Sequence, residues 1–134
     1  MVYVKGIVYR DNLIFPDTGS VDIHINGRPT LNISSILNGQ IYFLRMSSNI
    51  ASYSKHASKM EIIKPEKSNG LSKPSIVKVD HILKEVFRSH YPKGYLSEDD
   101  YTRVIAKFHG YQKVNCCESN HCSCCDYEII VKHS

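Results

Sequence analysis

Residues 41–46 constrain the fold more than any other part of the chain, because the run is apolar at every position except Arg45. Side chains of a β-strand point alternately to the two faces of a sheet, so a strand of this kind is usually covered on both sides. An Asn-Gly pair, Asn38-Gly39, precedes the run and is typical of a tight turn between strands. The run therefore predicts an inner strand of a barrel-like sheet.

Other parts of the chain also carry strand and turn signals. A second Asn-Gly pair, Asn26-Gly27, predicts another hairpin, and the segment from 11 to 22, with a proline and a glycine, predicts a long loop. In the segment from 75 to 83, alternation places Val77, Val79 and Leu83 on one face and Lys78 and Asp80 on the other. Strands are predicted at residues 2–9, 21–25, 28–36, 40–47, 60–64 and 75–83.

The clearest helix is predicted to start at Ser97. This serine is followed three residues later by Asp100, a spacing close to the capping box. Apolar side chains then recur at helical intervals, and Gly110 is a plausible end of the helix. The recurring apolar residues are Tyr101, Val104, Ile105 and Phe108. Residues 49–59 predict a loop or short helix, and residues 65–74 a polar loop.

Composition bounds the function only loosely. A chain of 134 residues with 42% apolar and 22% charged residues is most simply one globular domain. Its formal net charge of +4 favours anionic partners weakly. No apolar stretch has the length of a membrane-spanning helix, and the first residues lack the order of a signal peptide, so we expect no membrane association and a cytoplasmic protein.

Five motifs in order resemble the MazF/PemK family of toxin endoribonucleases from type II toxin–antitoxin systems. Together they cover residues 5–108. They are Lys5-Gly6-Ile7-Val8-Tyr9, Gly27-Arg28-Pro29-Thr30-Leu31, Phe43-Leu44-Arg45-Met46-Ser47-Ser48, Val77-Lys78-Val79-Asp80-His81-Ile82 and Gly94-Tyr95-Leu96-Ser97-Glu98. The resemblance implies a mainly β, α+β fold: an SH3-like, partly open β-barrel with packed helices, here over residues 1–110.

The resemblance also implies an activity and partners. The family members are mRNA interferases that inhibit growth by cutting single-stranded RNA without a metal, so no cofactor is expected. The products by analogy carry 2′,3′-cyclic phosphate and 5′-hydroxyl ends. The expected partners are single-stranded RNA, a small antitoxin protein and a second copy of the chain in a homodimer.

Several residues of this chain match family positions. Arg28 matches the catalytic arginine, and Ser47 stands where a catalytic threonine is usual. Asp80 matches an acid that contacts RNA, Lys78 stands where some members have arginine, and His81 where most have glutamine. The arginine that usually follows that glutamine is absent. Ser48 and His24 are further candidates for RNA contact.

The chemistry of these residues suits RNA cleavage by internal attack. Arg28 offers a planar, always charged fork to phosphate oxygens. Ser47 can donate a hydrogen bond where charge develops. His81 is a candidate acid or base, a role that histidine side chains often have, although its place beside Val77 and Val79 also fits a packed core histidine. His56, in a predicted loop, is a weaker candidate for the same groove.

Two other functions compete with cleavage. Asn32, His81 and the missing arginine depart from the family pattern, which favours a MazF-like module that binds nucleic acid or protein without cutting. A small β-barrel adaptor with no role in RNA is the third possibility. From composition alone, Arg28 would be a solvated hairpin residue and the Lys78–Asp80 pair an ordinary surface pair.

The family resemblance does not account for the cysteine-rich C-terminal extension, residues 111–134. Its candidate zinc ligands are Cys116, Cys117, His121, Cys122, Cys124 and Cys125. Their spacing fits no standard zinc pattern, so we expect no metal, with zinc as the alternative. A β-hairpin with reduced thiols, from 111–117 and 122–131, is the second interpretation. Disulfides are the third, and a reducing cytosol disfavours them.

Overall fold

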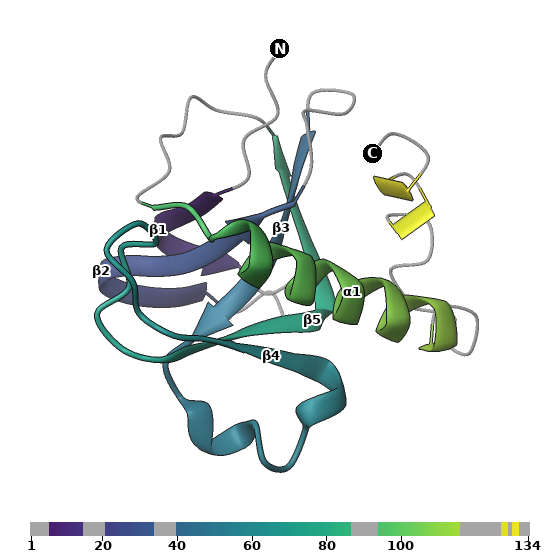
Figure 1. Cartoon of the computed structure of the whole chain (residues 1–134). Coiled ribbons are helices and arrows are strands. Elements are labelled where there is room, and N and C mark those ends of the chain that lie inside the picture. The colour runs from purple at the N-terminus through teal and green to yellow at the C-terminus, as the bar shows by residue number, and fades with distance from the viewer. Residues whose placement is uncertain are drawn as a thin grey trace.

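The computed structural model describes residues 6–14, 21–33, 40–86, 94–115, 127–128 and 130–131. Over these residues the chain is a mixed α+β fold, a curled half-barrel of five strands with one long helix (Figure 1). The strands are β1 (Gly6–Ile14), β2 (Val21–Asn32), β3 (Gln40–Ser47), β4 (Met60–Ile63) and β5 (Ser75–Val86). Two 3-10 turns, Ile50–Ser52 and Ala57–Lys59, precede β4, and the helix is α1 (Glu98–Asn115).

The sheet is antiparallel throughout and has the order β1-β2-β3-β5-β4. Its central strand is β3, which confirms the prediction from residues 41–46. All of these residues except Arg45 are buried, although they point to opposite faces. Tyr42, Leu44 and Met46 belong to the main core, whereas Ile41 and Phe43 form a second, smaller cluster with Leu83.

The predicted hairpin at Asn26-Gly27 is wrong, because both residues lie inside the continuous strand β2. The pairing of β2 with β1 shifts at this point. Arg10 on β1 pairs with Arg28, but Asn12, only two residues later, pairs with Ile23. The Asn-Gly pair is thus accommodated in an irregularity of one strand, where glycine is common, instead of reversing the chain. The predicted loop from 11 to 22 is also too long, since β1 continues to Ile14 and β2 begins at Val21. The Asn38-Gly39 turn lies outside the described residues.

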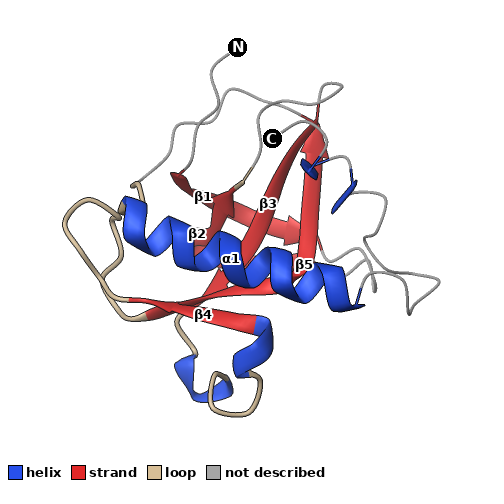
Figure 2. Ribbon diagram, turned by 45° about the vertical axis from the view of Figure 1, so that its right-hand side comes forward, coloured by secondary structure: helices blue, strands red, loops and turns tan. Residues whose placement is uncertain are grey.

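Helix α1 lies across one face of the sheet (Figure 2). Val104 and Phe108 are fully buried and share the main core with residues of all five strands, such as Ile7 on β1 and Ile63 on β4. The helix starts as predicted, because the Ser97 hydroxyl accepts a hydrogen bond from the Asp100 amide at 3.1 Å. The predicted end at Gly110 is wrong, since the helix continues through it to Asn115.

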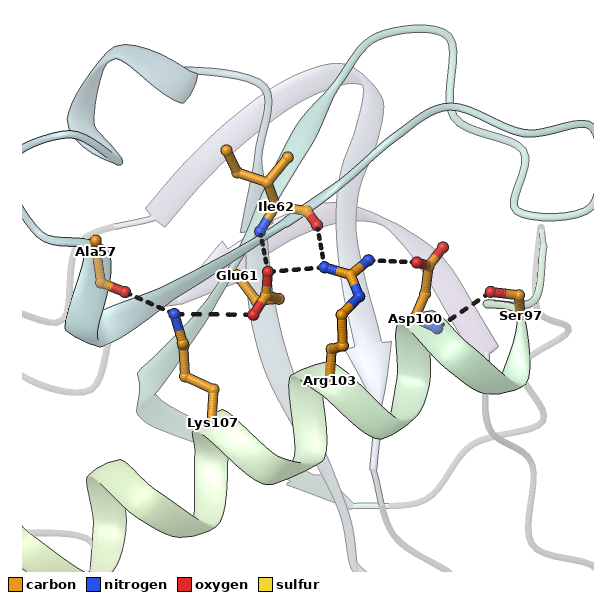
Figure 3. A network of polar contacts seen from close by, with 7 residues as sticks. All are labelled: Ala57, Glu61, Ile62, Ser97, Asp100, Arg103 and Lys107. Atoms are coloured by element: carbon orange, nitrogen blue, oxygen red, sulfur yellow. Dashed lines mark hydrogen bonds and ion pairs between the residues drawn. The ribbon is translucent and has the colours of Figure 1, made fainter.

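Polar contacts fix α1 to the edge strand β4 (Figure 3). Glu61 on β4 forms ion pairs with two cations of α1. Its Oε1 lies 2.9 Å from the guanidinium group of Arg103, and its Oε2 lies 3.8 Å from Nζ of Lys107. Arg103 also bonds to Asp100, one turn earlier on the helix, and this bond, together with the nearby carboxylates, raises its pKa further. Lys107 reaches beyond the strand to the carbonyl oxygen of Ala57 at 3.0 Å.

The last described residues pack against α1. Tyr127 and Ile130 are buried in the main core, and the Tyr127 hydroxyl is hydrogen-bonded to Nδ1 of His109 at 2.8 Å. Burial raises the pKa of Tyr127. The predicted C-terminal hairpin is wrong at the described ends of its two arms, which are helical at residues 111–115, 127–128 and 130–131. None of the described helices is long and apolar enough to cross a membrane.

Candidate nucleic-acid interface

The candidate residues of β3 lie on the sheet face that α1 does not cover. Met46 packs in the core with Val104 and Phe108 of α1. Strand alternation places Arg45 and Ser47, on either side of Met46, on the opposite face. Both are partly exposed, whereas the earlier residues of that face are fully covered. The face is therefore apolar along the first half of β3 and polar at its end.

Arg28 and Ser47 lie just beyond the paired part of β2 and β3. The last paired residues of β2 and β3 are Thr30 and Arg45. Two residues further along each strand lie Arg28 on β2 and Ser47 at the end of β3. Continuing the antiparallel register by two residues would place these two positions opposite each other.

The Ser47 hydroxyl is already oriented by the backbone that follows it. Its oxygen accepts a hydrogen bond from the Asn49 amide at 3.1 Å. Because the hydroxyl accepts this bond, its own proton remains available for donation to another oxygen. Ser48 is exposed and follows directly, where β3 has ended. The other candidate on β2, His24, lies within that strand, as the predicted strand at 21–25 requires.

A second row of the same face contains two cations. Arg45 on β3 lies directly opposite Lys78 on β5, and both side chains are partly exposed. Thr30 completes this row on the β2 side and is fully buried. Arg45 was not among the predicted site residues. The available signal was that it is the single charged residue in an otherwise apolar run.

Strand β5 is irregular beyond Lys78. Arg45 pairs with Lys78 but its neighbour Leu44 pairs with Ile82, so residues 79–81 are extra on β5. Bulges of this kind redirect side chains and are frequent beside functional sites. The prediction that Leu83 lies on the same face as Val77 is wrong, because Leu83 packs in the second cluster and Val77 in the main core. The three extra residues between them explain the change of face.

Asp80 and His81 occupy this irregular segment. His81 is 46% exposed, so its interpretation as a packed core residue is wrong, and its Nε2 lies 3.7 Å from Oδ2 of Asp80. The other carboxylate oxygen of Asp80, Oδ1, is buried and has no hydrogen-bond partner in the described structure. Such an oxygen is an acceptor for a ligand's N–H or O–H group.

The candidate residues therefore form two groups. Ser47 occupies one level of the sheet, where a continued register would also place Arg28, and Arg45 and Lys78 occupy the next level, two residues or about 7 Å away along β3. Asp80 and His81 lie beyond the second level, so His81 is not a direct neighbour of Ser47. His56 is exposed between the two 3-10 turns.

The possible zinc ligands of the C-terminal extension, from Cys116 to Cys125, lie outside the described residues. Within the described part of the chain, no three histidine, cysteine, aspartate or glutamate side chains are grouped as metal ligands would be.

Compared with known proteins, the chain matches no protein-family model and no curated protein. The resemblance to MazF/PemK toxins therefore depends on the five motifs quoted above.

Proposed function

We propose that the protein is a MazF-like endoribonuclease that cleaves single-stranded RNA by attack of a ribose 2′-hydroxyl on the adjacent phosphate. One observation carries the proposal: β2 and β3 pair antiparallel up to Thr30 and Arg45, each two residues from Arg28 and Ser47, so the same register continued would make these two positions neighbours. These two residues match the family's catalytic positions, and nothing in the sequence alone requires them to be adjacent. A mixed α+β half-barrel is also compatible with the proposal.

The proposed step needs charge stabilisation at the phosphate and two proton transfers. The 2′-oxygen bonds to phosphorus as it loses its proton, and the 5′-oxygen leaves with its electron pair and takes up a proton. The guanidinium group of Arg28 would bind the phosphate oxygens as their charge increases. The hydroxyl proton of Ser47 would add one hydrogen bond to the same oxygens. His81 and solvent water are candidates for the proton transfers.

Lys78, Asp80 and Ser48 would hold the RNA beside the reacting phosphate. Lys78 offers a cation to the backbone, and the unpartnered Oδ1 of Asp80 offers an acceptor to a base amino group or ribose hydroxyl. The proposal includes a homodimer and a small antitoxin that covers this surface, both from the family resemblance.

The test is incubation of the purified protein with long single-stranded RNA in EDTA. We expect fragments with 2′,3′-cyclic phosphate ends from the wild-type protein and none from Arg28→Ala. Ser47→Ala should cleave about 10²–10³ times more slowly, as is usual when one such donor is removed. Ser58→Ala is the matched control, because Ser58 is an exposed serine of the second 3-10 turn and should leave the rate unchanged.

The same experiment separates cleavage from the alternative of a binding module. If the wild-type protein binds the RNA but leaves it intact, the chain is a non-catalytic nucleic-acid-binding protein. If Arg28→Ala is folded and cuts at the wild-type rate, the assigned site is wrong.

A further inference from the structure

We infer that Gln112 on α1 is a positioning residue for the proposed RNA site, because it holds the bulge of β5 that sets Asp80 and His81 side by side. This inference rests on the proposed function, in which Asp80 contacts the RNA and His81 is a candidate for proton transfer. Gln112 is only 3% exposed, so it would act through the backbone of β5 and not by touching the RNA. It also lies beyond residues 5–108, which the family motifs cover.

The bulge gives Asp80 and His81 neighbouring positions that a regular strand would not. Successive residues of a regular strand point to opposite faces of the sheet. In β5, however, Val79 and Ile82 both pack in the main core, and the two residues between them reach the solvent. Nε2 of His81 lies 3.7 Å from Oδ2 of Asp80, so the two side chains lie together. Their proximity therefore depends on the backbone of the bulge.

The neighbouring strands do not fix this backbone by pairing. On β3, Arg45 pairs with Lys78, but the residue before Arg45 pairs with Ile82. Residues 79–81 therefore have no partner in the ladder with β3. On the other side, the pairing of β5 with β4 ends at Lys78. Buried backbone groups that leave the ladder in a bulge need another hydrogen-bond partner.

Gln112 provides such a partner from α1. Its Nε2 donates a hydrogen bond to the carbonyl oxygen of Val79 at 3.0 Å. The Val79 side chain is fully buried in the main core, which also contains Val104 and Phe108 of α1. Helix α1 thus holds the residue before Asp80 both by its side chain and by its backbone. Without the Gln112 donor, the carbonyl group would lose this hydrogen bond, and we expect the bulge to rearrange.

Asp80 depends on this support because its own polar contacts do not fix it. Its Oδ1 is buried and has no hydrogen-bond partner in the described structure, and its Oδ2 lies 3.7 Å from His81, beyond hydrogen-bond distance. The position of the carboxylate is therefore set by the backbone that carries it. A displacement of about 1 Å in a site can cost about 10²-fold in rate, even when the mutation is distant. We therefore expect loss of the Gln112 hydrogen bond to act on the RNA as loss of Asp80 does.

The test is a double-mutant cycle on RNA binding with Gln112→Met and Asp80→Ala. Methionine keeps the length of the glutamine side chain but has no N–H group to donate. The probe is a labelled single-stranded RNA of about 10 nucleotides whose 2′-oxygens are methylated, so that it lacks the attacking hydroxyl. Fluorescence anisotropy gives the dissociation constant of this probe for the wild type, both single variants and the double variant.

We expect each single variant to weaken binding roughly tenfold, as is usual when one hydrogen bond to a charged group is lost. The double variant should bind no more weakly than Asp80→Ala alone, because Gln112 acts through Asp80. Ser97→Ala is the matched control for stability, since Ser97 caps the other end of α1 with a hydrogen bond of 3.1 Å. Loss of that cap also destabilises the fold but should leave RNA binding unchanged.

The outcomes distinguish this inference from the proposed function. If the wild-type protein cleaves RNA but Gln112→Met binds the probe as tightly as the wild type, or weakens binding equally with and without Asp80, the positioning role is wrong and the ribonuclease stands. If the wild-type protein neither binds nor cuts RNA, both fall.

A crystal structure of Gln112→Met adds a measurement that needs no RNA. We expect the side chains of Asp80 and His81 to move apart, and an unchanged bulge with the same separation of 3.7 Å would overturn the inference. Thermal unfolding shows whether Gln112→Met is folded, and Gln112→Leu takes its place in both measurements if it is not.

Discussion

Replacing Gly94 by alanine tests how the loop before α1 is held against the sheet. A Cβ atom at this buried position would lie 2.2 Å from both the carbonyl carbon and the oxygen of Asn69. Real side chains essentially never approach so closely, and the obstacle is backbone that cannot rotate away. The two segments would have to separate.

The cost follows from what that separation breaks. The carbonyl oxygen of Gly94 accepts a hydrogen bond from Ile7 on β1 at 2.8 Å, and the next amide, of Tyr95, donates to Ser68 at 2.8 Å. Overpacking a rigid site costs about 1–3 kcal/mol and each weakened hydrogen bond about 1 kcal/mol. We therefore expect Gly94→Ala to lower the free energy of unfolding by roughly 3–5 kcal/mol, a large part of the usual total.

Gly110→Ala is the matched control, since the chemical change is the same. No atom lies within 4 Å of a Cβ built on Gly110, which is exposed within α1. Alanine favours a helix interior over glycine by about 1 kcal/mol, so this variant should be slightly more stable than the wild type. Urea and thermal unfolding followed by far-UV circular dichroism measure both. Equal stability of Gly94→Ala and wild type would refute the close approach of Gly94 to Asn69.

Three further predictions concern stability. Asn69→Ala should lower the free energy of unfolding by about 2–4 kcal/mol, as denaturant unfolding would measure. The buried Asn69 side chain accepts hydrogen bonds from two backbone amides, each at 3.0 Å, and donates one to a backbone carbonyl at 2.9 Å. Glu61→Gln should cost at most about 1 kcal/mol and the loss should shrink at high salt, because its partner Arg103 is 49% exposed; unfolding at two salt concentrations checks this. Burial, and to a smaller extent the charge of Lys113, lowers the pKa of His109 below its usual value of 6.5. The unfolded chain therefore binds this proton more tightly than the folded chain, and the wild type should lose stability as the pH falls from about 7.5 through 6.5 to the lowered pKa. His109→Gln should lose less over this range, and an equal loss in both proteins would contradict the role of His109.

The sequence predicted those elements whose local signals agree with their packing. β3 is apolar on both faces and proves to be buried on both, and Ser97 caps α1 as its spacing indicates. Local signals failed where a longer-range contact outweighed them. Asn26-Gly27 favours a turn, but pairing with β1 on both sides keeps the residues in one strand. Gly110 favours a helix end, yet Gln112 donates to the Val79 carbonyl at 3.0 Å and holds the next turn against β5.

The candidate site was predictable as a set of residues but not as an arrangement. The motifs named Arg28 and Ser47 separately, and only the pairing of β2 with β3, which ends two residues from each of them, relates their positions. Arg45 could not be matched with Lys78 from the sequence, because their pairing depends on the three extra residues in β5. When strict strand alternation is continued through that segment, it predicts the wrong face for Leu83 and a packed position for His81, which is exposed.

Under the proposed function, the two faces of β3 separate stability from RNA binding. Tyr42, Leu44 and Met46 pack in the main core, so changes there should alter unfolding first. Arg45 and Ser47 alternate with them, belong to the other face and are partly exposed. Under the proposed function, changes at these two residues should alter RNA binding or cleavage with less effect on folding. Because one short strand carries both sets of side chains, α1 and its ion pairs to β4 also hold the proposed interface in position. Loosening that attachment, as in Glu61→Gln, should therefore weaken RNA binding or cleavage only to the extent that it destabilises the fold.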